Sequence, residues 1–237
     1  MSSIAIIPAD GRNERILRKN FRAFCGWLIM EYSIEAALES RLFDEVVVST
    51  RDAEIAEAAR ACGAEVLLLQ SAAAADGFVT MADVLFEVFS TYRERDIWFE
   101  MMCCISPAAP FVTAEKLVRA EAAFRESGAE MLESVVAFSY PPQRSLSLSN
   151  GRFVYNDPRY VRARPQDLPT WNHDAEQFYY YQVPPFLRSM RFGGAQRGYD
   201  LSCAPFLLDE MEVQELKNPA DWHIAEWKYR RMKGAEK

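Results

Sequence analysis

The sequence lacks the features that mark membrane proteins, zinc proteins and nucleic-acid-binding proteins. It has no apolar run near the roughly 20 residues that a membrane-spanning helix needs, and no secretory signal pattern opens it. It has two histidines, and its five cysteines form no Cys-x-x-Cys pair, so no zinc constellation is present. Its formal charge of -7 leaves no general excess of cations for nucleic acid. We therefore expect a reduced, cytoplasmic protein without a membrane or nucleic-acid partner.

What the sequence does have is a long alternation of apolar segments. With 237 residues and 50% hydrophobic content the chain can fill one sizeable core, so residues 1–237 are predicted to form a single domain. Strands are predicted near 4–8, 46–48, 65–69, 97–105 and 131–138, and helices near 31–41, 52–62, 80–93 and 113–127. This alternation is typical of a doubly wound α/β fold with a mainly parallel sheet.

The alternation breaks after residue 138. Two short alternating runs, 145–149 and 152–155, flank Asn150-Gly151, which is the signature of a β-hairpin. The region 156–172 is rich in Pro, Arg and Tyr, so we predict that 139–172 is a projecting excursion that serves function or a subunit contact. Beyond it the sequence predicts a strand at 178–181, a short helix from Pro184, a last strand at 212–216 and a closing helix at 218–233.

The segment 4–20 has the character of a phosphate-binding loop. An apolar strand ends at Pro8-Ala9, and Gly11 in the polar loop that follows lets the backbone approach a ligand closely. Backbone amides of such a loop can donate to phosphate oxygens. Cationic side chains gather here and can neutralise phosphate charge: Arg12, Arg15, Arg18 and Lys19.

This loop resembles the opening motif of the acylneuraminate cytidylyltransferases, which activate acidic nine-carbon sugars. The matching positions are Pro8, Ala9, Gly11, Arg15, Ile16, Arg18, Lys19 and Asn20. Later segments keep the order and spacing of members that act on pseudaminic acid: 31–37, 42–46, 48–50, 110–115, 173–175 and 177–179. The resemblance covers nearly the whole chain. It implies a Rossmann-like nucleotidyltransferase fold and a CTP-dependent reaction that makes the CMP-sugar of pseudaminic acid or a related nonulosonic acid and releases pyrophosphate.

The resemblance also implies roles for individual residues. Lys19 and Arg15 would be catalytic, and the nucleotide would be bound by Ala9, Gly11, Arg12, Asn20 and Thr80. The sugar would be bound by Arg164, His173, Asp174, Gln177 and Tyr179, and Mg²⁺ by Glu215. Members of the family pair through the projecting region, so a homodimer is expected, with Tyr155, Tyr160 and Trp171 as candidate contacts.

Several of these residues also admit a structural interpretation. Lys19 and Asn20 can be solvated loop residues, and Thr80 can be the N-terminal residue of a helix. Arg164 can be one of several surface cations on a Pro-rich segment. For His173 a positioning role is preferred to acid-base chemistry, because adjacent residues on a strand point to opposite faces.

Departures from the family pattern fall where ligands bind. Asp10 and Glu14 stand where the family has an arginine and a lysine, and Lys217 stands where it has a second metal-binding aspartate. Glu176 replaces a glycine. The substitutions put the Mg²⁺ site in question and leave a second hypothesis open, a catalytically impaired relative that keeps the fold for binding or assembly. In a third hypothesis, Asp10 and Glu14 form a relocated metal site. This hypothesis requires coordinated changes, whereas unselected substitution of these residues requires none.

Overall fold

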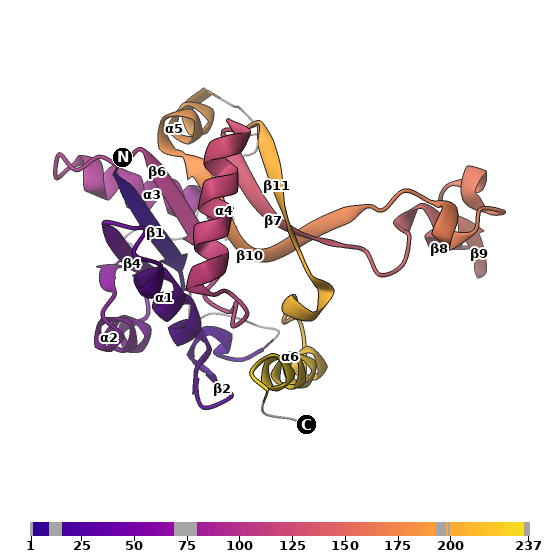
Figure 1. The fold of residues 1–237 in the computed structure, drawn as a ribbon, viewed down its shortest axis with the longest axis horizontal. Coiled ribbons are helices and arrows are strands. Elements are labelled where there is room, and N and C mark those ends of the chain that lie inside the picture. The colour runs from indigo at the N-terminus through magenta and orange to yellow at the C-terminus, as the bar shows by residue number, and fades with distance from the viewer. Residues whose placement is uncertain (1, 10–15, 69–79, 193–197, 199, 235–237) are drawn as a thin grey trace.

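A seven-stranded sheet with helices on both faces forms the body of the protein (Figure 1). The computed structural model describes residues 2–9, 16–68, 80–192, 198 and 200–234. The strands of this sheet are β1 (Ser3–Pro8), β4 (Glu45–Thr50), β5 (Glu65–Leu68), β6 (Met101–Ile105), β7 (Met131–Ala137), β10 (Asn172–Gln182) and β11 (Cys203–Leu208). The helices are α1 (Ile29–Ser40), α2 (Ala53–Ala61), α3 (Met81–Arg93), α4 (Ala114–Ser127), α5 (Val183–Phe192) and α6 (Pro219–Met232). A two-residue pair, β2 (Ala23–Phe24) and β3 (Trp27–Leu28), precedes α1.

The strand order is β11-β7-β10-β6-β1-β4-β5. Pairing is parallel from β6 through β1 and β4 to β5, and again between β7 and β11. β10 lies antiparallel between β6 and β7, so the other six strands share one direction. The predicted, mainly parallel, doubly wound sheet is therefore confirmed. The insertion of one reversed strand was not predicted.

The alternation of side chains along β1 shows how both faces are covered. Ala5 and Ile7 lie in the hydrophobic cluster formed with α1, α2 and α4, whereas Ile4 and Ile6 lie in the cluster formed with α3 and α5. All four side chains are fully buried. A strand with both faces covered reads as a continuous apolar run, which is why β1 was recognisable from the sequence.

Local signals fixed most of the helix boundaries. Asp52 Oδ1 accepts a hydrogen bond from Glu54 N at 2.9 Å and caps α2, as predicted. Gly63 follows the end of α2 with a φ of +89°, a conformation that favours glycine. Thr113 caps α4 and Asn218 caps α6 through their side chains. None of the helices in the part of the chain that the structure describes combines the length and the apolar character needed to cross a bilayer.

The predicted last strand at 212–216 is wrong. Glu210–Glu212 forms a 3₁₀ turn, and the segment after it forms no strand. The edge strand is β11 instead, which pairs with β7 from Cys203 to Leu208. Val213 and Leu216, which gave the apolar alternation, are buried. Hydrogen bonds from the side chains of Gln177 and Lys228 hold the segment in place of strand pairing.

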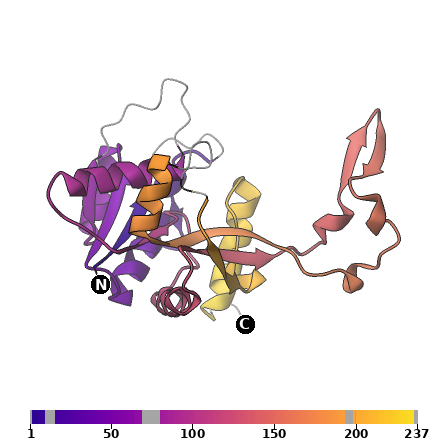
Figure 2. The same ribbon diagram turned by 90° about the horizontal axis from the view of Figure 1, so that it is seen from above.

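Residues 139–172 project from the body as an arm (Figures 1 and 2). Its tip is the predicted hairpin of β8 (Leu146–Ser149) and β9 (Arg152–Tyr155). Asn150 and Gly151 both have positive φ, 50° and 73°, as a two-residue type I′ turn requires. The hairpin is not packed against the body, and Leu148 and Phe153 are 68% and 75% exposed.

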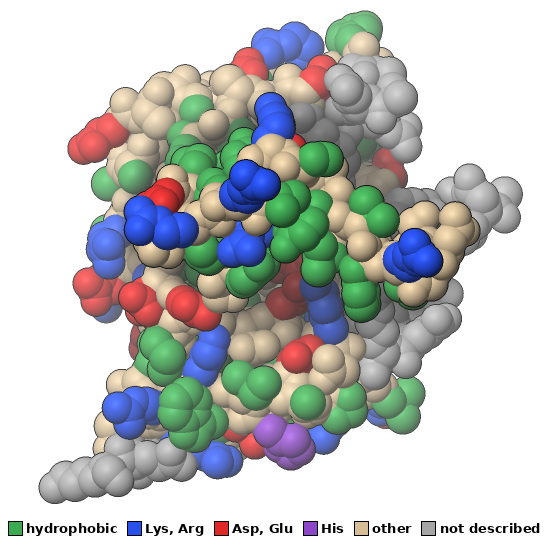
Figure 3. All heavy atoms as spheres, turned by 90° about the vertical axis from the view of Figure 1, so that its right-hand side faces the viewer, with side chains coloured by type: hydrophobic (Ala, Val, Ile, Leu, Met, Phe, Trp, Pro, Cys, Tyr) green, Lys and Arg blue, Asp and Glu red, His purple; other side chains and the backbone are tan. Residues whose placement is uncertain are grey.

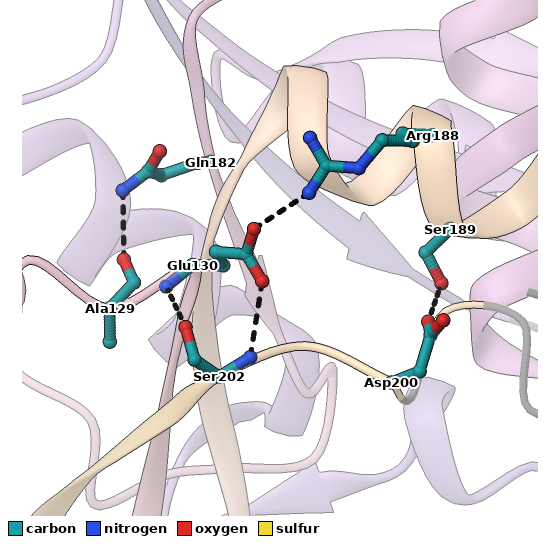
Figure 4. A network of polar contacts seen from close by, with 7 residues as sticks. All are labelled: Ala129, Glu130, Gln182, Arg188, Ser189, Asp200 and Ser202. Carbon is teal, nitrogen blue, oxygen red and sulfur yellow. Dashed lines mark hydrogen bonds and ion pairs between the residues drawn. The ribbon is translucent and has the colours of Figure 1, made fainter.

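A polar network fastens β11 to the body at the end of the sheet opposite the arm (Figure 4). The Glu130 carboxylate accepts hydrogen bonds from Arg188 at 2.7 Å and from Ser202 N at 3.2 Å. Ser202 Oγ in turn accepts from Glu130 N at 3.1 Å. Gln182 donates to Ala129 O at 2.8 Å. The network ties together the segments that precede β7, α5 and β11.

Candidate functional site

The candidate site lies at the edge of the sheet where the parallel strands end. In open α/β sheets ligands bind outside the carboxyl ends of the strands. β1 ends here at Pro8, and Ala9 N donates to Ser49 O of β4 at 2.9 Å, so the chain leaves the sheet toward this edge. Ala9, Ser49 and Thr50 are buried. Six residues of the predicted phosphate loop lie outside the described residues: Asp10, Gly11, Arg12, Asn13, Glu14 and Arg15.

Lys19 and Asn20 belong to a short 3₁₀ turn, Lys19–Phe21, that follows the loop. Arg18 before it has a φ of +53°, and its guanidinium pairs with Glu54 and lies 4.8 Å from the ring centre of Phe21. Asn20 is buried and Lys19 is half-buried. The interpretation of Asn20 as a solvated loop residue is therefore wrong.

A bulge in β10 gathers four of the five predicted sugar-binding residues: His173, Asp174, Gln177 and Tyr179. The pairing of β10 with β7 shifts register between Asp174 and Tyr179, and Glu176 within the bulge has a φ of +53°. Asp174 Oδ1 accepts from Glu176 N at 2.7 Å, and Asp174 Oδ2 accepts from the Tyr179 hydroxyl at 2.5 Å. His173 Nδ1 lies 2.7 Å from Asp174 O, and its ring centre is 4.7 Å from that of Phe138. Both of these contacts of the His173 ring are with neighbouring parts of the chain, and its positioning role stays a prediction.

The bulge is where charged groups from three parts of the chain meet. Burial, followed by the nearby carboxylates of Glu215 and Asp174, raises the pKa of the Glu176 carboxyl. Lys217 and Lys19 act in the opposite direction on the same group. Lys19, the β10 bulge and the C-terminal segment therefore share one electrostatic neighbourhood.

Gln177 joins the bulge to the segment that follows β11. Its side-chain nitrogen donates to Glu212 O at 2.5 Å, and its backbone O accepts from Ser106 N at 2.9 Å. Lys116 of α4 holds the same segment, because its ammonium donates to Phe111 O at 2.8 Å and lies 3.2 Å from Glu212 Oε1. Gln177, predicted to bind sugar, thus uses its amide nitrogen to position the C-terminal segment.

A pocket of about 290 Å³ opens between the base of the arm and the C-terminal segment. His173 and Asp174 line it from β10, and Glu215 lines it from the segment opposite. Lys228 of α6 also lines it and donates to Glu210 O at 2.9 Å and Val213 O at 2.7 Å. Figure 3 shows this side of the molecule, with the surface hollowed and acidic and basic side chains side by side.

Thr80 and Arg164, two further predicted site residues, also have structural partners. Thr80 caps α3: its hydroxyl accepts from Asp83 N at 3.2 Å and donates to Asp83 Oδ2 at 2.7 Å, which agrees with the alternative interpretation. Arg164 lies on the arm, where it forms two hydrogen bonds with Asp167, at 2.6 and 2.9 Å. The structure does not bring Arg164 together with the candidates on the body.

Sequence reasoning missed three contributors to this site. Glu176 was noted only as a departure from a glycine, although it is the carboxylate at the centre of the charged groups. Lys116 and Lys228 were not recognised because each holds backbone carbonyls through its ammonium. Such contacts leave no spacing signal in the sequence.

Comparisons with known proteins agree with the resemblance inferred from the sequence. Residues 4–192 match the profile of a family described as cytidylyltransferase. A pseudaminic acid cytidylyltransferase of Campylobacter jejuni is 34% identical over 181 residues, which cover 76% of this chain and 78% of the relative. A CMP-N,N'-diacetyllegionaminic acid synthase of Legionella pneumophila is 31% identical over 159 residues, 65% of this chain and 66% of the relative. A solved CMP:2-keto-3-deoxy-manno-octonic acid synthetase, complexed with CTP, has the same fold with a TM-score of 0.66 at 14% identity, covering 98% of this chain and 100% of that one.

Proposed function

Because this chain belongs to the cytidylyltransferase family, we propose that it uses CTP to activate pseudaminic acid or a related nonulosonic acid, forming the CMP-sugar and releasing pyrophosphate. The observation that carries the proposal is the 34% identity, over 76% of the chain, to a relative named for this activity. The relative named for legionaminic acid supports the same class of acidic sugar and leaves the choice within the class open.

The arrangement of charges supports the proposed roles. Lys19 lies beside the β10 bulge at the edge of the sheet where nucleotide phosphates are expected, and we assign it to charge neutralisation there. The other nucleotide assignments stay proposals: Ala9, Gly11, Arg12, Arg15, Asn20 and Thr80. The sugar assignments also stay proposals: Arg164, His173, Asp174, Gln177 and Tyr179.

The reaction needs a group that accepts a proton. The anomeric hydroxyl oxygen of the sugar bonds to the α-phosphorus of CTP, the bond from that phosphorus to the bridging oxygen breaks, and pyrophosphate leaves. Both oxygens of Asp174 already accept hydrogen bonds, from Glu176 N and Tyr179. Burial beside the carboxylates of Glu215 and Asp174 raises the pKa of the Glu176 carboxyl, which makes its carboxylate a better proton acceptor than a solvated one. We assign the hydroxyl proton to Glu176.

The arm supports the proposal of a homodimer. Its hairpin exposes Leu148 and Phe153, and Trp171 at its base is also exposed. Exposed apolar side chains on a projecting element that packs on no other part of the body are typical of an interface. Tyr155 and Tyr160, which are half-buried, stay the further candidate contacts.

The proposal places the enzyme in the cytoplasm. All five cysteines are free, and Cys103 and Cys104 are buried side by side without a disulfide. Free thiols fit a reducing compartment. Cell fractionation with an antibody against the chain tests this placement.

Pyrophosphate release tests the proposed function directly. The full chain is mixed with CTP and pseudaminic acid, and we expect pyrophosphate and the CMP-sugar in equal amounts. Lys19→Met should weaken CTP binding, whereas Lys233→Met, which removes an exposed lysine at the end of α6, should leave it unchanged. Absence of both product and CTP binding would refute the proposal.

A second candidate function is nucleotide or sugar binding without turnover. It is favoured by the Lys217–Glu215 ion pair and by the anionic residues Asp10 and Glu14 in the phosphate loop. Asp10→Arg combined with Glu14→Lys changes the loop charge by four units and should raise CTP affinity if loop repulsion limits binding. A chain that binds CTP but releases no pyrophosphate, before and after this change, would support the second function.

A further inference from the structure

The C-terminal segment holds an ammonium group where the family resemblance places a metal ion. Lys217 Nζ forms an ion pair with Glu215 Oε2. Leu216 between them is buried in a cluster that contains Trp222, whereas Glu215 and Lys217 are partly exposed. The pair is close enough to the β10 bulge for both of its members to act on the Glu176 carboxyl.

The position of this ion pair is fixed by the backbone on either side. Lys217 N donates to Asp221 Oδ2 at 2.8 Å, within the capping arrangement that begins α6. At the other end of the segment, Val213 O accepts from Lys228 Nζ at 2.7 Å. The backbone of the segment is thus held on both sides of the pair, and the Lys217 side chain, which is 55% exposed, is directed by its ion pair with Glu215.

The charges around Glu176 are nearly balanced by lysines alone. Three carboxylates, those of Asp174, Glu176 and Glu215, share this neighbourhood with the ammonium groups of Lys19 and Lys217. The sum of three negative and two positive charges is -1. Most of the negative charge is therefore compensated by groups that the chain itself supplies.

A magnesium ion does not fit this arrangement. Mg²⁺ needs oxygen ligands in near-octahedral geometry at about 2.1 Å. Glu215 already holds Lys217, whose ammonium repels a divalent cation. Across the described ranges, no three His, Cys, Asp or Glu side chains are grouped so that they could hold a metal ion.

We propose that Lys217 is a built-in cation of the nucleotide site, whose ammonium supplies the positive charge that a carboxylate-held metal ion would otherwise supply at this position. When a phosphate enters, Lys217 shifts its ion pair from Glu215 to a phosphate oxygen. The inference rests on the proposed function in taking CTP as the ligand. It has a direct consequence: CTP binding depends on Lys217 and persists without divalent cations.

Isothermal titration of CTP into the full chain, with EDTA or with Mg²⁺, tests this consequence. We expect the two dissociation constants to agree within about threefold. Lys217→Met should weaken CTP binding in EDTA by about tenfold or more, because a charge-assisted contact to phosphate is lost. Lys217→Arg should retain binding, and Lys233→Met is the matched control that also removes one lysine from the C-terminal region. Circular dichroism and melting curves show whether each variant is folded.

A second measurement does not use the nucleotide. Lys217→Asp replaces the ammonium with a carboxylate beside Glu215, so the variant should bind Mn²⁺ more tightly than the parent by electron paramagnetic resonance. Its CTP binding should then require a divalent cation.

The outcomes separate this inference from the proposed function. If the parent chain binds CTP in the presence of Mg²⁺ but does not bind CTP in EDTA, the inference of a built-in cation is refuted and the proposed function stands. Equal CTP affinity of Lys217→Met and the parent in EDTA would also refute it. If CTP binds under neither condition, the proposed function fails, and the inference falls with it.

Discussion

Replacing Lys116 with methionine should loosen the C-terminal segment and lower the stability of the whole domain. The Lys116 side chain is 7% exposed, and its ammonium both donates to Phe111 O at 2.8 Å and lies 3.2 Å from Glu212 Oε1. Methionine has a similar length but no donor, so Phe111 O and Glu212 both lose their partner.

The size of the effect follows from two opposing terms. A buried hydrogen bond to a charged group contributes roughly 1.5–3 kcal/mol. Against it, burial lowers the pKa of Lys116 although Glu212 acts to raise it, so placing the ammonium here has a desolvation cost that methionine avoids. The lowered pKa describes only the balance between the ammonium and the neutral amine forms of Lys116. Both forms can donate to Phe111 O, whereas methionine cannot. We expect a net loss of about 1–2 kcal/mol, which lowers the melting temperature of a domain of this size by about 2–8 °C.

Differential scanning calorimetry of Lys116→Met, Glu212→Gln and the double variant measures this loss. Because the two side chains are in contact, the double variant should lose less than the sum of the single variants, with a coupling energy of about 0.5 kcal/mol or more. Lys233→Met serves as the surface control. A Lys116→Met chain that melts with the parent, or strictly additive losses, would contradict the role assigned to Lys116.

Three further changes have distinct expected outcomes. The double variant Leu148→Glu, Phe153→Glu places two charges on the exposed arm hairpin and should convert a dimer into monomers without lowering the melting temperature of the monomer. Light scattering measures the mass, and a parent chain that is already monomeric at micromolar concentration would end the dimer proposal. Thr80→Ala should cost about 1 kcal/mol in urea unfolding through loss of the α3 cap, and unchanged CTP affinity would show that Thr80 is structural. The pKa of the Glu176 carboxyl is raised in the folded state. As pH rises above the pKa that this carboxyl has in the unfolded chain, the folded state binds more protons than the unfolded state, so ionisation of Glu176 lowers the stability of the fold toward neutral pH. Glu176→Gln should therefore gain stability relative to the parent as pH rises from acidic to neutral, and a constant difference across that range would argue against a raised pKa.

The sequence predicted elements whose signals are local. β1 was visible as an apolar run, α2 and α4 through their caps Asp52 and Thr113, and the arm hairpin through Asn150-Gly151. Each of these depends on neighbours a few residues away, so a single sequence contains the whole signal.

The features that could not be predicted depend on partners far along the chain. The alternation at 212–216 resembles a strand, but Gln177, Lys116 and Lys228 hold that segment from other elements. The direction of β10 and the identity of the edge strand are likewise set by long-range pairing. In the candidate site, the family motif proposed Lys19 and Glu215 as site residues, whereas Glu176 became a candidate only when the bulge placed it among charges from three elements.

The reversed strand β10 also dictates when the protein can finish folding. β10 joins β6 to β7, yet the 66 residues 106–171 separate it from β6 along the chain, between Met101–Ile105 and Asn172–Gln182. Until the ribosome has made residue 182, β6 presents an unpaired edge of fully apolar residues, and β7 has no place in the sheet. Closing such distant contacts is slow, and open apolar edges invite association between nascent chains. Synthesis of this protein therefore includes an interval in which β1, β4, β5 and β6 can pair while the other edge of β6 is still open to association.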